Sequence, residues 1–332
     1  MAARLTILFL LAVLFVAARP TAVGNWTKRS AGTMTGLRSV YFLDDMRGWA
    51  AGGAGTLLTT SDGGQTWQIK RRWSGDILWD VYFADAQTGW LLAERSIHNL
   101  KTNEETRSYV LHTKDGGATW TRLNLFGLDP GMLLVRFAFA GKAMGYVFGE
   151  YGTLYASSGG EELWSARAVP TRRLLLGGSF IDGGRGWLVG AGATLLQTID
   201  GGESWREHKI AELENARLNA VVFVDERHGW AVGAGGTIVR TADGGKKWET
   251  QTSANGEDLF DVKFIDKSEG WAVGANGTIL HTIDGGVRWF TERSGTGHPL
   301  ARLFFNESSR RGCAVGFGGT ILTYAPEVAS PE

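Results

Sequence analysis

A sevenfold internal repeat constrains this chain more than any other feature of its sequence. A glycine, followed by Trp in five copies, recurs at intervals of 41, 56, 41, 43, 41 and 42 residues, at Gly48, Gly89, Gly145, Gly186, Gly229, Gly270 and Gly312. A phenylalanine precedes this glycine by six residues in six copies and by seven in the last, at Phe42, Phe83, Phe139, Phe180, Phe223, Phe264 and Phe305. Units of about 40 residues match one four-stranded propeller blade. The repeat therefore predicts an all-β, seven-bladed β-propeller.

Each unit contains four short strand signals, which are clearest in the copy over residues 259–289. Alternating apolar residues predict a half-buried first strand over 259–264, and Gly-Trp-Ala-Val-Gly predicts a buried second strand over 270–274. A glycine turn over 275–277 precedes a third strand over 278–282, which is rich in β-branched residues. The residues after Trp289 form the fourth strand.

The third and fourth strands are joined by the sequence Thr-x-Asp-Gly-Gly-x-x-Trp, the Asp box. Its complete copies have the aspartates Asp62, Asp115, Asp200, Asp243 and Asp284, whereas the third unit has only Ser157–Gly160 at this place. The carboxylate can accept backbone N–H groups of its own hairpin, and glycine supplies the positive φ of the turn. We therefore expect a structural role for the Asp boxes, on the face opposite the binding site.

The two ends of the chain complete one blade. The seventh unit stops at Tyr324 without an Asp box, and Trp26 lies 41 residues before Trp67, one full period. Residues Gly24 to Lys28 are thus expected to form the outermost strand of the last blade, which leaves no open sheet edge between the ends. The predicted domain is a propeller over 25–325, followed by a short tail over 326–332.

The first 24 residues have the pattern of a signal peptide. Arg4 precedes an apolar run from Leu5 to Ala18, which is shorter than the roughly 20 residues of a membrane span. Cleavage is expected near Ala22-Val23-Gly24, with cleavage after Ala18 as the alternative and an uncleaved membrane anchor left open. No cysteine follows the apolar run, which argues against a bacterial lipid anchor.

Charge and cysteine content narrow the function further. The formal net charge is zero, and removing Arg4 and Arg19 leaves 32 basic and 34 acidic residues, which argues against nucleic-acid binding. Arginine makes up 24 of the 34 basic residues, a bias that favours protein recognition or reflects genomic composition. The single cysteine, Cys313, allows no intrachain disulfide and occupies a repeat position of Trp, so we expect a small core residue there.

The sequence has no strong enzyme motif. It lacks a Gly-x-Ser-x-Gly elbow, a phosphate-binding loop and a His-Glu-x-x-His motif, and its six histidines are scattered. We therefore predict no catalytic residue, no cofactor and no metal. Asp80 and Asp261 share one first-strand position, which favours a structural or channel-lining role, although a glycosidase carboxylate pair stays open.

A binding site is expected on the face formed by the connections between blades and the turns between second and third strands. Basic and aromatic residues outside the repeat pattern mark this face, at Arg71, Arg72, Trp73, Trp79, Arg172, Arg173 and Arg217. Tryptophan beside arginine is typical of recognition surfaces, and ordinary packing between blades is the alternative for both Trp residues. A polar insertion over Arg95–Arg107 lies on the same face, as a binding element or as a tolerated surface loop.

With the repeat written out, the chain resembles the photosystem II stability and assembly factors, Asp-box propellers of cyanobacteria and chloroplasts. The residues that carry the resemblance are Gly-Trp-Ala-Val-Gly, Gly-Thr-Ile and Thr-x-Asp-Gly-Gly-x-x-Trp, at 229–248 and 270–289, and the repeat extends it over 25–325. The resemblance implies a non-enzymatic protein of the periplasm or thylakoid lumen that binds photosystem II reaction-centre protein through an arginine-lined face.

Our hypothesis is an exported, monomeric protein-binding scaffold that recognises a segment of an exported or membrane protein. The alternative is a glycan-binding or glycoside-hydrolysing propeller, because sialidases also contain Asp boxes. The sialidase Arg-Ile-Pro signature is absent, and the regular blades leave little room for active-site insertions.

Overall fold

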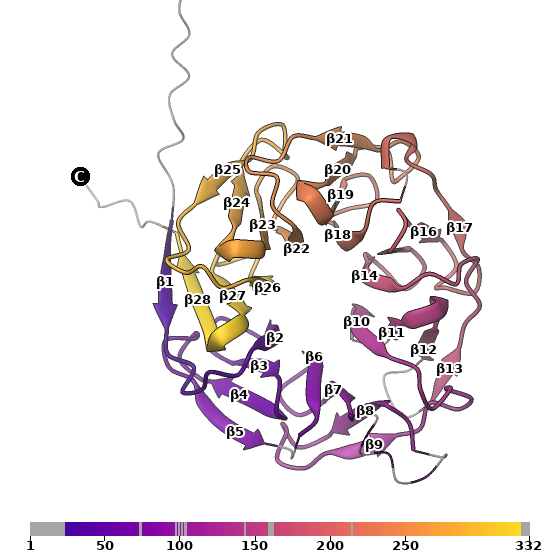
Figure 1. Ribbon diagram of the computed structural model, residues 1–332, viewed down its shortest axis with the longest axis vertical. Coiled ribbons are helices and arrows are strands. Elements are labelled where there is room, and N and C mark those ends of the chain that lie inside the picture. The colour runs from indigo at the N-terminus through magenta and orange to yellow at the C-terminus, as the bar shows by residue number, and fades with distance from the viewer. Residues whose placement is uncertain are drawn as a thin grey trace, which may run out of the picture.

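The chain forms a closed ring of seven four-stranded antiparallel sheets, as predicted (Figure 1). This computed structural model describes residues 24–326 except 73, 74, 97, 99, 101, 103, 104, 143, 159–162 and 214. The predicted signal peptide and most of the predicted tail therefore lie outside the described residues. Among the described residues, no helix is long and apolar enough to cross a membrane.

Each sheet is one blade and follows the repeat. Blades 1 to 4 contain β2 (Leu37–Phe42), β3 (Gly48–Gly52), β4 (Thr56–Thr60) and β5 (Gln68–Arg72); β6 (Ile77–Phe83), β7 (Gly89–Glu94), β8 (Ser108–Thr113) and β9 (Thr121–Leu123); β10 (Leu134–Ala140), β11 (Met144–Gly149), β12 (Leu154–Ser158) and β13 (Trp164–Ala166); and β14 (Leu175–Phe180), β15 (Gly186–Gly190), β16 (Leu195–Thr198) and β17 (Arg206–Glu207). Blades 5 to 7 contain β18 (Leu218–Phe223), β19 (Gly229–Gly233), β20 (Ile238–Thr241) and β21 (Glu249–Gln251); β22 (Leu259–Phe264), β23 (Gly270–Gly274), β24 (Ile279–Thr282) and β25 (Phe290–Glu292); and β26 (Leu300–Phe305), β27 (Gly312–Gly316), β28 (Thr320–Ala325) and β1 (Asn25–Arg29).

Short 3-10 helices fill several of the remaining connections. Four of them occupy turns between second and third strands, at η2 (Glu150–Gly152), η4 (Ala234–Gly236), η5 (Ala275–Gly277) and η6 (Phe317–Gly319), and η3 (Ala211–Leu213) lies between blades 4 and 5. In η5, Asn276 has a φ of 53°, a conformation that Asn tolerates better than most residues. The turn predicted at 275–277 is therefore present, and its central residue has left-handed rather than helical backbone.

The first strand of every blade faces the centre of the ring and the fourth strand lies on the rim (Figure 1). All seven first strands shift register against the second strand at one place, between the residues five and three positions before the repeat Phe. Such a bulge bends a strand and redirects its side chains. It recurs next to the channel, where the seven strands converge.

Stacked aromatic rings join neighbouring blades. Phe223 stacks on Trp187 of the preceding blade, with ring centroids 3.5 Å apart, and meets its own Asp-box Trp248 edge-on at 5.8 Å. The same arrangement recurs for the repeat phenylalanines Phe83, Phe180, Phe264 and Phe305. For Phe180, the stacked residue is Tyr146 instead of Trp. For Phe305, Trp26 and Tyr324 take the place of the Asp-box Trp. These contacts add to the free energy gained by burying the rings, and they explain why the repeat preserves Phe and Trp together.

Cys313 occupies the Trp position of blade 7 and is buried. Phe304, directly opposite in the register of β26 and β27, reaches the Phe42 ring of the next blade at a centroid distance of 5.5 Å. Phe304 of β26 thus contacts Phe42, whereas the repeat position in β27, which is Trp in five other blades, is the small residue Cys313. Burial raises the pKa of the Cys313 thiol, which fits the core role expected from the sequence.

The ring closes through pairing of β1 with β28, in which Trp26 lies opposite Tyr324. The closing strand is Asn25–Arg29, so its predicted bounds, Gly24 to Lys28, were wrong by one residue. Gly24 instead donates its backbone N–H to the Tyr324 hydroxyl at 3.2 Å. The N-terminal strand therefore completes blade 7, as the period between the two Trp residues predicted.

Candidate functional site

Backbone hydrogen bonds divide the loops into two opposite faces. Turns between second and third strands bond to the connections between blades, for example Glu150 N–H to Leu133 O at 2.9 Å and Ala275 N–H to Asp258 O at 2.8 Å. Asp-box turns bond to loops between first and second strands, for example Gly63 N–H to Met46 O at 2.9 Å. We call the first the connection face and the second the Asp-box face.

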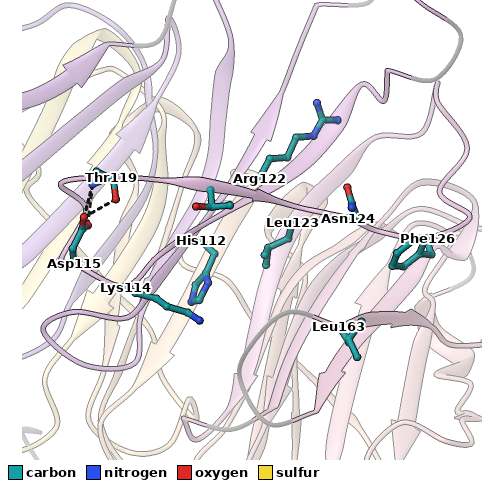
Figure 2. Close-up of a pocket in the computed structure, with 10 residues that line it drawn as sticks. His112, Lys114, Asp115, Thr119, Arg122, Leu123, Asn124, Phe126 and Leu163 are labelled. Carbon is teal, nitrogen blue, oxygen red and sulfur yellow. Dashed lines mark hydrogen bonds between the residues drawn. The ribbon is translucent and has the colours of Figure 1, made fainter.

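The Asp boxes bind their own hairpins. In blade 2, Asp115 accepts the backbone N–H of Thr119 at 2.9 Å and its hydroxyl at 2.6 Å, as the dashed lines in Figure 2 show. Thr113 donates to Asp115 at 2.7 Å, and its oxygen accepts the N–H of Gly117. Each carboxylate oxygen is thus occupied by local donors, which leaves the aspartate a structural group.

The same hydrogen bonds lower the pKa values of the Asp-box carboxyls. Bonds from the hydroxyl and N–H of the residue four positions on lower the pKa of Asp62, Asp115 and Asp200 to about 2. In Asp243 the backbone N–H of Lys247 lowers the pKa of the carboxyl. All four carboxyls are at least partly exposed, so solvent screens them and they stay charged at neutral pH.

The three predicted arginines whose side chains are described lie on the connection face. Arg172 and Arg173 follow blade 3, and Arg217 follows blade 4; all three are exposed. Arg173 donates to the carbonyl of Gly192, and Arg217 forms an ion pair with Asp258 at 3.8 Å. No ion pair involves Arg172 within the described ranges, so its charge is available to a partner.

The predicted residues between blades 1 and 2 are described only in part. Arg71 and Arg72 end β5, where they lie opposite Leu57 and Thr56, and nothing is described of their side chains. Trp73 lies outside the described residues. These two arginines are therefore placed by their backbone alone, at the end of β5 that leads into the connection face.

Trp79 belongs to a compact polar cluster at the start of β6. Its indole N–H donates to Glu94 at 2.7 Å, and the guanidinium of Arg38 lies over its ring, 4.1 Å from the centroid. Burial lowers the pKa of the Arg38 guanidinium, and Glu94 opposes this shift. The cation–π contact and the hydrogen bond hold the ring partly exposed beside the channel.

The insertion in blade 2 is anchored beside this cluster. Arg107 binds Glu94 at 2.6 Å and lies 3.8 Å from Glu150 of η2. Arg95 pairs with Glu105 inside the insertion at 3.0 Å. The described part of the insertion is thus tied by ion pairs to two blades, and its charges are largely balanced.

The position three residues before each repeat Phe forms a ring in the channel, with the members Ser39, Asp80, Arg136, Gly177, Ala220, Asp261 and Arg302. Asp80 accepts the Phe137 N–H at 2.9 Å and pairs with Arg302 at 3.1 Å. Asp261 accepts the Leu303 N–H at 2.9 Å and pairs with Arg136 at 2.5 Å. Burial raises the pKa of Asp80, and Arg136 opposes the shift.

Each of the two carboxylates is thus held by a backbone N–H and by an arginine of another blade, an arrangement that fits a structural role and not the free acid and base of a glycosidase. Their role is to hold blades together across the channel. Among the described residues, no group of three His, Cys, Asp or Glu is placed to hold a metal ion.

A hollow of about 480 Å³ lies on the rim of blade 2, between β9 and the start of β13 (Figure 2). Its lining includes the Asp-box residues Asp115 and Thr119, with Phe126 68% and Leu163 72% exposed at one end. The hollow is open, and none of the predicted binding residues whose side chains are described lines it. It is distinct from the connection face.

Comparison with known proteins identifies the family of this fold. A family model described as "Photosynthesis system II assembly factor YCF48" matches residues 9–101, 156–251 and 212–293, well over half of the chain. The chain belongs to this family. The resemblance stated from the repeat is therefore confirmed.

Individual Ycf48 relatives align over shorter segments. The chain is 43% identical over 61 residues to the photosystem II assembly protein Ycf48 of Thermosynechococcus vestitus, covering 18% of each protein. It is 31% identical over 93 residues to the chloroplastic stability/assembly factor HCF136 of Arabidopsis thaliana, covering 26% of this chain and 23% of that protein. It is 27% identical over 216 residues to the assembly lipoprotein Ycf48 of a Synechococcus strain, covering 61% and 58%. Each alignment thus covers less than two thirds of the relative's own length.

Solved structures share the fold of this Ycf48 family member. A structure titled "YCF48 bound to D1 peptide" matches with a TM-score of 0.73 at 22% identity and covers 91% of this chain and 97% of the other. A GH74 xyloglucanase matches with a TM-score of 0.66 at 16% identity, covering 90% of this chain and 53% of the enzyme. At these identities the similarity establishes the propeller fold and does not indicate an activity.

Sequence reasoning missed most of the polar partners. Arg38, Glu94 and Arg107 complete the Trp79 cluster, and Arg136 and Arg302 complete the channel ring. A signal existed for both groups, because aligning the units on the repeat Phe places Arg38 and Trp79 at one position and the four channel charges at another.

Proposed function

We propose that this chain is a non-enzymatic, exported scaffold that binds a segment of photosystem II reaction-centre protein on its connection face, in the manner of an assembly factor. The family match over most of the chain carries this proposal. One structural neighbour, which aligns with this chain over 97% of the neighbour's length, is titled as bound to a D1 peptide. This supports a peptide as the ligand.

The connection face offers suitable chemistry for such a segment. Arg172, Arg173 and Arg217 are exposed there, and Arg71 and Arg72 end the strand that leads to it. Arginine binds carboxylates through a planar, bidentate fork. Trp79 and Arg38 add a partly exposed aromatic surface that the Glu94 hydrogen bond holds in place. We infer an extended segment with acidic side chains.

Export is part of the proposal. The apolar run over 5–18 has the length of a signal-peptide core, and two relatives carry the words chloroplastic and lipoprotein in their names. We propose that residues 1–24 direct the chain across a membrane to the periplasm or thylakoid lumen, where it acts as a monomer.

The test measures binding of overlapping synthetic peptides that together cover D1, using the purified chain from residue 25 onward. We expect one acidic peptide to bind, with an affinity that falls at higher salt because surface charges are screened. Changing Arg172 and Arg173 together to Glu is expected to weaken binding about tenfold or more. Arg288→Glu, at an exposed arginine of an Asp box, is the matched control.

Binding that survives the Arg172/Arg173 variant but falls in Arg288→Glu would move the site to the Asp-box face. Absence of binding by every D1 peptide would refute the proposed partner. Export is measured separately, from the cellular fraction that holds the chain with and without residues 1–24.

A further inference from the structure

The central channel contains a cavity of about 310 Å³ that is separate from the connection face. Its wall is formed by the residue directly before the repeat Phe in all seven blades, which are Tyr41, Tyr82, Ala138, Ser179, Val222, Lys263 and Phe304. First strands run from the connection face toward the Asp-box face, so this wall lies at the Asp-box end of the channel. Among the residues proposed to bind the partner, none whose side chain is described lines it.

The charged ring forms the floor of the cavity. Asp80, Arg136 and Arg302 line it, whereas Arg38 and Trp79, one position nearer the connection face, do not. The ion pairs of this ring join blade 2 to blade 7 and blade 3 to blade 6. On the side of the connection face, the cavity therefore ends at a polar layer.

One side of the wall is aromatic and rigid. The ring of Tyr41 lies 4.9 Å from that of Tyr82 and 5.7 Å from that of Phe304. Tyr82 also stacks on Phe139 at 3.7 Å and donates its hydroxyl to the carbonyl of Gly141 at 3.0 Å. All three wall rings are only partly buried, so a flat ligand can cover them at little cost in side-chain entropy.

The other side of the cavity has an unmatched positive charge. Lys263 lines the cavity and is partly buried, and no ion pair or hydrogen bond involves its ammonium group in the part of the chain that the structure describes. In each of the two Arg–Asp pairs of the floor, the positive and negative charges cancel. Arg302, which is 9% exposed, also has an Nε–H without an acceptor. A buried donor without a partner costs free energy, and an anionic group in the cavity would satisfy both cations.

We propose that the Asp-box end of the channel binds a small organic anion with one planar ring, such as an aromatic carboxylate. The ring packs against Tyr41, Tyr82 and Phe304, and the carboxylate faces Lys263 and the Arg302 guanidinium. The volume is at the lower end of the roughly 300–1,000 Å³ that small-molecule sites span, which favours a ligand of one ring. This site is independent of the proposed partner, because it lies on the opposite face.

Calorimetric titration of the purified chain with 4-hydroxybenzoate tests the proposal. We expect saturable one-to-one binding in the millimolar range or tighter, with benzyl alcohol and acetate each about tenfold weaker because each lacks half of the recognised chemistry. Lys263→Gln is expected to weaken binding about tenfold. Lys267→Gln removes the same charge from an exposed loop of the same blade and is expected to change nothing.

A second variant tests the place of binding without altering charge. Val222→Phe adds volume to the cavity wall and is expected to abolish binding while the circular dichroism spectrum and the D1-peptide affinity stay as in the wild type. The proposal is overturned by absence of saturable binding, by equal binding of acetate, or by equal affinity of Lys263→Gln and Lys267→Gln. The D1-peptide assay is independent of the 4-hydroxybenzoate titration, so failure of the proposed function and failure of the channel site can be told apart.

Discussion

The indole N–H of Trp26 donates to the carboxylate of Glu292 at 2.7 Å, between two residues that are 266 positions apart in the chain. Trp26 lies in the N-terminal strand of blade 7, and Glu292 ends the last strand of blade 6. The same indole contacts Phe305 and Tyr324 of blade 7 at centroid distances of 5.9 and 5.3 Å. The closing strand is thus fixed to two blades through one side chain.

Removing this side chain should weaken the ring at its closure. We expect Trp26→Ala to lower the free energy of unfolding by about 2 to 3 kcal/mol, since a partly buried aromatic ring and its hydrogen bond are lost. Trp26→Phe, which loses chiefly the hydrogen bond, should cost about 1 kcal/mol. Urea denaturation measures both, with Asn25→Ala on the exposed side of the same strand as control. Equal stability of Trp26→Ala and Asn25→Ala would contradict the role of Trp26.

The Arg136–Asp261 pair should show strong coupling between blades 3 and 6. Asp261→Asn leaves the partly buried guanidinium of Arg136 without its counter-charge, and we expect a loss of about 3 kcal/mol in unfolding free energy. Combining Asp261→Asn with Arg136→Met should recover about half of that loss, because the uncompensated charge is gone. A double-mutant cycle measured by denaturation gives the coupling, and additive losses would argue against the pair.

The blades were predictable because each is specified locally. The Asp box, the Gly-Trp step and the alternation before the repeat Phe lie within about 40 residues of one another and recur around the ring, so every copy supports the others. The spacing of Trp26 and Trp67 also predicted the closure of the ring. The seventh unit lacks its fourth strand at the C-terminus, and the extra strand at the N-terminus supplies it.

The polar contacts across the ring were not predictable in the same way. Strand alternation places Asp80, Arg136, Asp261 and Arg302 beside the channel, but it does not determine which cation pairs with which carboxylate. Arg136 reaches Asp261 over 125 residues of sequence, past two intervening blades. That choice depends on the curvature of the ring and on the bulge in each first strand. The Trp79–Arg38 contact depends on the same bulge.

Acid should weaken the protein through its Asp boxes. The folded pKa of Asp62 is lowered to about 2, below the value of roughly 3.9 in an unfolded chain. The folded state then binds fewer protons than the unfolded state between these two values, so the stabilisation is complete above about pH 4 and is lost as the pH falls through about 2. Asp62→Asn removes this contribution, so the stability gap between wild type and variant should narrow as the pH falls from about 5 to about 2. Urea denaturation at several pH values measures the gap, and a constant gap would contradict the assignment.

Cys313 should be unreactive until the ring opens. Its side chain is 1% exposed, and burial raises the pKa of its thiol, so little thiolate forms near neutral pH. We expect no reaction with iodoacetamide at mildly alkaline pH in the folded protein and complete alkylation in guanidinium chloride. Mass spectrometry of the intact chain measures both states. Because blade 7 contains both ends of the chain, the Trp26→Ala variant should react faster than the wild type under native conditions. Rapid alkylation of the native wild type would show that the Cys313 site opens readily and would contradict its place in the core.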